Sequence, residues 1–198
     1  MNVTIIQYNA GNIQSVLYAL ERLGITATVT DDAAMIQASD KVIFPGVGEA
    51  STAMSYLKAR NLDQLIVSLK QPVLGICLGM QLMCQHSAEN DTRCLGIFEE
   101  QVLAFKAKEA SFKIPQIGWN TISNLKTDLF KGIAENSFTY FVHGYYAGMG
   151  FNTIATTNYI QEYSSALQKN NFYGVQFHPE KSAVVGEQII QNFLALKS

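Results

Sequence analysis

A single cysteine, Cys77, lies inside the stretch Gly75-Ile-Cys-Leu-Gly79. An apolar run precedes it and residues with helical spacing follow it, so we expect Cys77 on a tight turn between a strand and a helix. Such a turn presents its side chain above the carboxyl edge of a parallel sheet, and glycines permit the close backbone approach that it needs. The unpaired N–H groups at the start of the following helix would stabilise a thiolate at Cys77, and the N–H of Leu78 could face an oxyanion. The pattern predicts a nucleophile; the alternative is a small buried hydrophobic residue.

A nucleophilic cysteine needs a base, and His178 has the most suitable surroundings. It ends a strand-like stretch and is followed by a proline, which cannot continue a strand. Residues i and i+2 of an extended chain point to the same side, so Glu180 can hold and polarise the imidazole of His178. We therefore predict Cys77 as nucleophile, His178 as base and Glu180 as the group that orients the base.

The other histidines and cysteines do not join this group. We expect His86 at the end of the helix that follows Cys77, facing solvent or capping that helix. His143 lies in an aromatic, strand-like stretch, where a packed histidine and a substrate-lining one are both compatible with the sequence. Cys84 is expected in the helix core and Cys94 in a loop, both as reduced thiols. Because zinc-ligand spacing is absent, we expect no metal site.

The stretch Phe44-Pro-Gly-Val-Gly48 follows another apolar strand pattern and would lie at the same sheet edge. Its glycines allow peptide N–H groups to turn inward, so Val47 and Gly48 are candidates for the second half of an oxyanion hole. The stretch lacks the lysine and the spacing of a phosphate-binding loop. An ordinary strand-to-helix turn would carry the same glycines and proline.

Alternating strands and helices must position these residues in the first half of the chain. Apolar runs predict strands over 3–8, 26–30, 41–44 and 72–76. Helical spacing predicts helices over 13–23, with Asn12 as the N-cap, over 50–70 as one broken or two short helices, and over 78–87. This alternation is typical of a parallel sheet with helices on both faces.

The pattern changes in the second half. Short strands are expected over 101–106, 119–123, 138–147 and 153–158, with few helical stretches between them. A last strand over 172–178 and a helix over 184–196 follow. The sequence therefore predicts an α/β fold with an open, mostly parallel sheet, helices on both faces and an antiparallel extension in the second half.

Composition argues against several classes of function. The 198 residues are 48% hydrophobic and 15% charged, as expected for one compact domain with a substantial core. A net charge of −2 gives no basic footprint for nucleic acid or for an anionic membrane. The sequence shows no signal-peptide pattern and no apolar run of about 20 residues. We expect a cytoplasmic protein.

Three motifs, PGVG, GICLGMQ and GVQFHPEKS, occur in an order and at separations that resemble the class I (triad) glutamine amidotransferases. YNAGNIQSV, IGWN and YFVHGYYA narrow the resemblance to the glutaminase subunits of imidazole glycerol phosphate synthase. The resemblance runs from Ile5 to the last helix, essentially the whole chain. It implies a single flavodoxin-like domain over residues 1–198.

The resemblance implies that glutamine is hydrolysed to glutamate and ammonia by the triad Cys77, His178 and Glu180, without a cofactor. Backbone N–H groups of Leu78 and of Val47-Gly48 would stabilise the tetrahedral oxyanion. Members of the family hold glutamine through residues that correspond here to Gly48, Gln81, Glu89, His143, Gly144 and Tyr145. From the residues alone, Gln81 could equally be a polar residue on a helix face.

The resemblance also implies a partner, the (β/α)8 cyclase subunit, in a heterodimer with this chain. The cyclase would use the ammonia to make imidazole glycerol phosphate and aminoimidazole carboxamide ribotide in histidine biosynthesis. Ammonia released into water would be protonated near neutral pH, so the partner should dock over the active site. Candidate docking residues are Asn12, Gln116, Trp119 and Lys181. A core position for Trp119, the only tryptophan, is equally compatible with the sequence.

Two positions depart from the family pattern. Gln116 stands where many members have histidine, and Gly144 where serine or threonine is common. The first puts a titratable interface contact in question, and the second removes a hydroxyl from the expected glutamine pocket.

Other interpretations of the sequence are a free-standing cysteine hydrolase or peptidase, a binding module, and a glutaminase of anthranilate, purine or pyridoxal phosphate synthesis. PGVG in place of PGPG, with IGWN downstream, argues against the anthranilate type.

Overall fold

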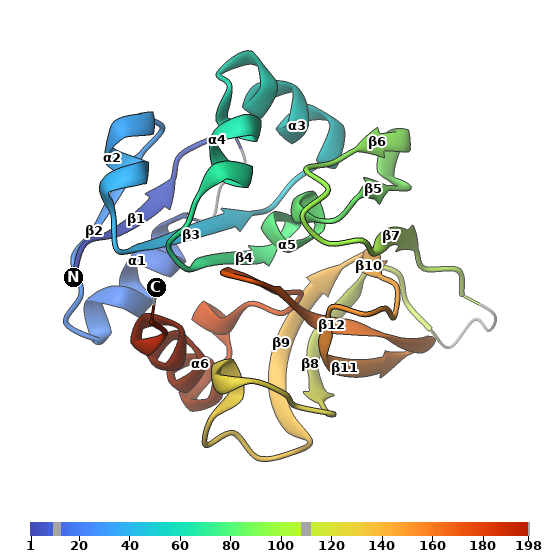
Figure 1. Cartoon of the computed structure of the whole chain (residues 1–198). Helices are drawn as coiled ribbons and strands as arrows, with labels where there is room; N and C mark the ends of the chain where they lie inside the picture. The colour runs from blue at the N-terminus through green and yellow to red at the C-terminus, as the bar shows by residue number, and fades with distance from the viewer. Residues whose placement is uncertain (10–12, 108–111, 198) are drawn as a thin grey trace.

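The computed structural model of the chain describes residues 1–9, 13–107 and 112–197. Five parallel strands lie at its centre in the order β2-β1-β3-β4-β13 (Figure 1). Their bounds are β1 Val3–Ile6, β2 Ala27–Thr30, β3 Lys41–Gly46, β4 Val73–Cys77 and β13 Phe172–Val175. The carboxyl ends of β3, β4 and β13 therefore meet at one edge of the sheet, where open α/β sheets bind ligands.

Helices cover both faces of these strands (Figure 1). One face carries α1 (Ile13–Arg22) and α6 (Ala183–Ala195), and the other carries α2 (Ala33–Ala38), α3 (Ala50–Ala59), α4 (Leu62–Ser68) and α5 (Leu78–Met83). The side chains of β3 alternate accordingly: Val42 and Phe44 pack on the side of α3, and Ile43 packs on the side of α1. Because both faces of β1, β3 and β4 are buried, these three strands are largely apolar in the sequence, whereas the edge strand β2 is only partly buried.

The rest of the large sheet is mainly antiparallel. β12 (Gln161–Lys169) pairs with β13 and with β11 (Thr153–Tyr159), and β10 (Tyr145–Ala147) joins β12 to β7 (Gln101–Ala104). The short strands β5 (His86–Ser87) and β6 (Thr92–Arg93) continue the sheet beyond β7. Single 3-10 turns lie between the strands and helices: η1 (Glu89–Asp91), η2 (Asp128–Phe130) and η3 (Pro179–Lys181).

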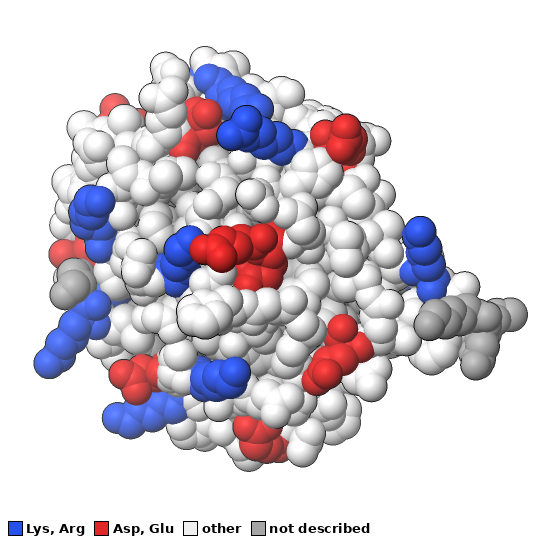
Figure 2. All heavy atoms as spheres, turned by 45° about the vertical axis from the view of Figure 1, so that its right-hand side comes forward, with Lys and Arg blue, Asp and Glu red and all other residues white. Residues whose placement is uncertain are grey.

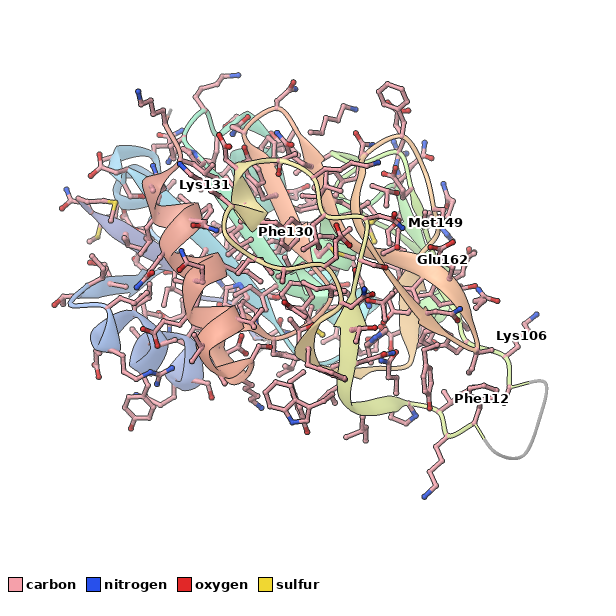
Figure 3. All side chains as sticks on the ribbon, turned by 90° about the horizontal axis from the view of Figure 1, so that it is seen from below. Lys106, Phe112, Phe130, Lys131, Met149 and Glu162 are labelled. Atoms are coloured by element: carbon pink, nitrogen blue, oxygen red, sulfur yellow. The ribbon has the colours of Figure 1, made fainter. Side chains whose placement is uncertain are left out.

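A separate antiparallel pair, β8 (Gln116–Ile122) and β9 (Ser137–His143), packs beside α6. The backbone N–H of His178 donates to the carbonyl of Tyr140 at 2.9 Å and so ties the end of β13 to β9. Asn192 of α6 donates to the carbonyls of Leu129 and Lys131, at 3.0 and 2.8 Å. These bonds hold η2 beside α6, as the positions of Phe130 and Lys131 show (Figure 3).

The predicted α/β fold with an antiparallel extension is confirmed, but several elements differ from the prediction. The helix after Cys77 ends at Met83, not at residue 87, because the backbone N–H groups of Gln85 and Ala88 pair with carbonyls beside or within β7. The strand expected over 138–147 is broken at Gly144 into β9 and β10, which belong to different sheets. The last strand ends at Val175. The sequence did not indicate α2 or β12.

Acidic and basic side chains of the described residues are interspersed on the face shown in Figure 2, without one large region of a single sign. This face therefore offers no extended basic surface for a polyanion. Among the described residues, no helix combines the length and the apolar character that crossing a membrane requires.

Candidate active site

Cys77 is the last residue of β4 and directly precedes α5, with a backbone φ of 53° and ψ of −109°. Such a conformation costs on the order of 1–3 kcal/mol for a residue with a side chain, so the packing around it must hold the turn. A Cβ on Gly79 would overlap the carbonyl group of Phe44, and a Cβ on Gly75 would lie 2.8 Å from the backbone nitrogen of Met80. The two glycines therefore let α5 press against β3 and β4 and place Cys77 at the sheet edge.

His178 lies just beyond β13 and is held by Glu180. Its Nδ1 donates to Glu180 Oε1 at 2.7 Å, and the exposed fractions of the two side chains are 4% and 2%. Ser182 fixes the main chain here, because its hydroxyl donates to the carbonyl of His178 at 2.6 Å and accepts from the N–H of Tyr140 at 2.9 Å. The buried carboxylate thus orients the imidazole, whose other side interacts with Cys77.

The surroundings of His178 favour its charged form. Burial opposes the imidazolium, but hydrogen bonds to Cys77 and Glu180, together with the negative charge of both groups, outweigh burial and raise the pKa of His178 to about 10. At neutral pH the ring therefore carries a proton that it can donate.

A cavity of about 330 Å³ opens at this edge of the sheet. Most of the predicted site residues line it: Val47, Gly48, Cys77, Leu78, Gln81, Glu89, His143, Gly144, Tyr145, His178 and Lys181. They come from the turns that follow β3 and β4, from η1, from the junction of β9 with β10, and from the end of β13. The fold thus brings together segments that lie far apart in the chain.

The turn after β3 forms one wall of the cavity. Gly48 has a φ of +119°, which residues with side chains rarely adopt. The hydroxyl of buried Tyr8 donates to the carbonyl of Pro45 at 2.6 Å and anchors this turn. Leu78 is the first residue of α5, so its N–H has no partner within the helix and is available at the cavity.

Another wall is formed by side chains that hydrogen bonds tie together. Gln81 Nε2 and His143 Nδ1 both donate to the carbonyl of Tyr145, at 2.9 and 2.7 Å. Burial lowers the pKa of His143 to about 4, so its ring is neutral at pH 7 and is unsuited to act as the acid of the site. Glu89 Oε2 accepts from the N–H of Ala50 at 2.8 Å, and burial raises the pKa of this carboxyl.

Residues 4–196 match the family model described as glutamine amidotransferase class-I. The chain belongs to the class I glutamine amidotransferase family. Relatives named imidazole glycerol phosphate synthase subunit HisH include one from Bacteroides fragilis, 57% identical over 196 residues and covering 99% of this chain and 100% of the relative. Another, from Colwellia psychrerythraea, is 44% identical over 210 residues and covers 98% and 92%. The resemblance predicted from the motifs, including its narrower form, is confirmed.

The fold of this amidotransferase agrees with a solved structure. A crystal structure of a glutamine amidotransferase from Thermotoga maritima has a TM-score of 0.63 at 17% identity, and the match covers 98% of this chain and 82% of that chain. At this identity the likeness shows the fold alone.

The four predicted docking residues of the amidotransferase have different positions. Asn12 lies outside the described residues. Gln116 is buried, and its side-chain oxygen accepts from the Tyr163 hydroxyl at 3.0 Å, so its side chain points into the protein rather than to the surface. Trp119 is 53% exposed, which excludes the core alternative. Lys181 lines the cavity.

The remaining histidine and cysteines lie outside the cavity lining. His86 is on β5 rather than at a helix end, and its Nε2 lies 2.8 Å from Oδ1 of Asp91. Cys84 directly follows α5, Cys94 follows β6, and both thiols are buried and free. Burial raises the pKa of both, that of Cys94 to about 11, so they stay protonated at neutral pH. Within the described parts of the chain, no three His, Cys, Asp or Glu residues gather as a metal site would require.

The sequence interpretation missed three residues of the site. Pro115 and Val142 line the cavity, and Gln176 Nε2 lies 3.7 Å from Sγ of Cys77. Gln176 could have been found, because it precedes His178 by two residues and the period of an extended strand puts both on one side. Nothing in the sequence marked Pro115 or Val142, whose positions depend on how the β8–β9 pair packs.

Proposed function

We propose that this chain hydrolyses glutamine to glutamate and ammonia as the glutaminase subunit of an imidazole glycerol phosphate synthase, in histidine biosynthesis. The observation that carries the proposal is Cys77 on a positive-φ turn beside a charged histidine that a buried glutamate orients. The relatives named imidazole glycerol phosphate synthase subunit HisH support the pathway. These three side chains suffice for amide hydrolysis without a cofactor.

In the first step, the thiolate of Cys77 attacks the side-chain amide carbon of glutamine, and the carbonyl oxygen becomes an oxyanion. The N–H of Leu78 would face this oxygen and stabilise its charge, and the Val47-Gly48 segment would supply the second donor when the partner docks. The carbon–nitrogen bond then breaks, and the proton of His178 goes to the departing nitrogen, so ammonia leaves and a γ-glutamyl thioester remains on Cys77.

In the second step, water attacks the thioester. His178, now neutral, takes a proton from the water, while Glu180 stabilises the imidazolium that forms again. The carbon–sulfur bond breaks, glutamate leaves, and the thiolate is restored. The same two donors stabilise the second tetrahedral oxyanion, so the chain needs one site for both steps.

The remaining predicted residues would hold the substrate. The carboxylate of Glu89 offers a partner for the α-ammonium group of glutamine. Gly48, Gln81, His143, Gly144 and Tyr145 line the same cavity. Because His143 is neutral at pH 7, it would contribute hydrogen bonding rather than charge.

Replacement of Cys77 tests the proposed chemistry. Cys77→Ser and Cys77→Ala should abolish glutamate formation while the circular dichroism spectrum stays that of the parent, because both changes are small. A glutamine-derived chloroketone should label Cys77 and leave Cys84 and Cys94 unlabelled, as mass spectrometry can show. Hydrolysis of glutamine by either variant, or equal labelling of all three thiols, would overturn the proposed nucleophile.

We further propose that the (β/α)8 cyclase subunit docks over the cavity and receives the ammonia. The outer face of the β8–β9 pair supports this: Ile117, Trp119 and Phe138 are 64%, 53% and 58% exposed. Ile117 is paired with Val142, which lines the cavity, so this apolar face continues to the cavity itself. Exposed apolar patches of this kind mark protein interaction sites. Trp119 and Lys181 remain our docking candidates.

The cyclase subunit would also control the rate of glutamine hydrolysis. We expect slow hydrolysis in the isolated chain and an increase by orders of magnitude when the cyclase and its ligand are both present, because docking would complete the oxyanion hole at Val47-Gly48. We also propose that residues 1–198 act as one domain and that the heterodimer works in the cytoplasm.

Mixing the purified proteins and measuring glutamate formation tests this coupling. Trp119→Ala should raise the cyclase concentration needed for half-maximal stimulation by roughly tenfold or more, as expected for a buried aromatic contact, and leave the rate of the isolated chain unchanged. Phe151→Ala is the matched control: Phe151 is 98% exposed but lies on the turn between β10 and β11, outside the cavity lining. Full activity of the isolated chain would overturn the coupling, though not the glutaminase chemistry.

A further inference from the structure

Gln176 is a fully buried polar residue that the mechanism has not used. It follows β13 directly, has no exposed surface, and its backbone N–H donates to the carbonyl of Ser165 at 2.9 Å. Its side-chain Nε2 lies 3.7 Å from Sγ of Cys77, within hydrogen-bond distance for sulfur. An amide buried at such a position is costly unless each polar end finds a partner.

The orientation of this amide is fixed by a second glutamine. Gln81 Nε2 donates to Gln176 Oε1 at 2.9 Å and also to the carbonyl of Tyr145 at 2.9 Å. Because the oxygen of Gln176 accepts this bond, its NH₂ group must point the other way, toward Cys77. The chain of contacts runs from Tyr145 through Gln81 and Gln176 to the sulfur.

We propose that Gln176 donates a hydrogen bond to the sulfur of Cys77, that this bond stabilises the thiolate, and that Gln81 orients Gln176 for this role. The inference rests on the proposed function, since it assigns Gln176 to the same nucleophile. His178 then supplies one donor to the sulfur and Gln176 a second, on a buried side chain that does not titrate. A buried anion with two donors is better stabilised than one with a single ion-pair partner.

The proposal gives Gln81 a second role, in addition to lining the substrate cavity. Both bonds that its NH₂ group makes are to the protein, so its donors are occupied in the free chain. Through Tyr145, which lines the cavity, a bound substrate would be connected to the nucleophile by this same chain of contacts. Loss of Gln81 should therefore affect the reactivity of Cys77 even when no glutamine is present.

The pH dependence of Cys77 alkylation by iodoacetamide, followed by mass spectrometry on the full chain without substrate, tests the bond directly. Gln176→Met keeps the length of the side chain and removes the donor. It should raise the pH of half-maximal alkylation by about one unit, the effect of losing a hydrogen bond to a charged group. Gln176→Glu, which places a carboxylate beside the sulfur, should raise the pH of half-maximal alkylation further.

Two further variants keep the test decisive. Gln81→Met leaves Gln176 in place but removes the bond that orients it, and should shift the profile in the same direction by less. Gln116→Met removes another buried glutamine, whose side-chain oxygen accepts from the Tyr163 hydroxyl, and should leave the alkylation profile unchanged. A profile for folded Gln176→Met that superimposes on the parent overturns the proposal. If neither Gln176 variant folds, an unchanged profile for Gln81→Met overturns it.

The assay also separates this inference from the proposed function. Alkylation needs no glutamine turnover, so a parent chain that fails to hydrolyse glutamine would refute the function and leave the hydrogen bond testable. A parent chain that hydrolyses glutamine, together with variants whose alkylation profiles are unchanged, would refute the role of Gln176 and leave the function intact.

Discussion

Two histidines face the same cavity from two different sheets, and near neutral pH their surroundings leave one charged and the other neutral. His178 follows the parallel strand β13, where its bonds to Cys77 and Glu180 outweigh burial and raise its pKa to about 10. His143 ends the antiparallel strand β9 among aromatic rings, where burial lowers its pKa to about 4. Near neutral pH only the first can donate a proton.

This difference in the charge of the two histidines indicates different roles for the parallel and the antiparallel strands. The parallel strands end in a positive-φ cysteine, a charged histidine and close glycine contacts, so they would supply the chemistry. The antiparallel strands present neutral groups that bind one another, such as His143 and Tyr145, so they would shape the substrate side. Variants at the ends of the parallel strands should therefore change turnover, and variants in the extension should change binding or stability.

The largest effect should come from His178→Asn, which removes the proton donor at the end of β13. We expect kcat to fall by about 10² to 10⁴ with little change in KM, the usual contribution of a positioned acid or base. Glu180→Gln should lower kcat less, because Glu180 only orients the ring. Steady-state kinetics can compare them, with His86→Asn, outside the cavity lining, as the control. A greater loss in Glu180→Gln would contradict this division of roles.

Replacement of Gly79 or Gly144 by alanine should show that the Cys77 turn is more tightly packed than the junction of β9 with β10. At Gly79 the new Cβ would overlap the backbone carbonyl of Phe44, and neither α5 nor β3 can move without disturbing the Cys77 turn. We expect Gly79→Ala to lower the free energy of unfolding by about 3 kcal/mol or more. At Gly144 a Cβ would only touch Ile114 and Pro115, both at 3.9 Å.

Gly144→Ala should therefore change the free energy of unfolding by less than about 0.5 kcal/mol. Urea denaturation of both variants measures the contrast. Equal losses would show that the Cys77 turn is no more tightly packed than the junction of β9 with β10.

The same contrast explains how far the sequence could predict the fold. All five parallel strands were predicted. Burial on both faces makes β1, β3 and β4 short, largely apolar runs between turn residues, and β-branched residues mark the partly buried edge strand β2. β12 was missed, since its sequence QEYSSALQK has neither a clear apolar run nor regular alternation and is held by pairing with β11 and β13. The helix after Cys77 was predicted too long, because only the long-range pairing of residues 85–88 with β7 ends it.

The candidate site follows the same rule. Cys77, His178 and Glu180 lie in local motifs whose turn and strand geometry the sequence specifies, so their proximity could be predicted. Gln116 was expected at the surface, yet the register of β8 against β9 places it opposite His143 and turns it inward. Pairing register depends on residues distant in the chain, and a change of one residue moves every side chain to the other face.

The smallest of the three effects should be a change in how stability depends on pH, caused by His143. In the unfolded chain the ring of His143 binds a proton near pH 6.5, whereas in the folded chain the buried ring binds one only near pH 4. Between these values the unfolded state holds more protons, so the free energy of unfolding falls as pH falls through this window. The contribution of His178 has the opposite sign and a different window: it is complete below pH 6.5 and is lost as pH rises toward 10.

His143→Gln keeps an N–H donor for the carbonyl of Tyr145 but cannot be protonated. At pH 7 the variant should be less stable than the parent because its packing is poorer, and this deficit should shrink as pH falls from 6.5 to 4. The change can reach roughly 3 kcal/mol, at about 1.4 kcal/mol for each pH unit of the window. Urea denaturation of both proteins at several pH values gives the difference, from which titrations common to both cancel. A constant difference between pH 7 and pH 4 would show that His143 is not held neutral, and the contrast between the two histidines would fail.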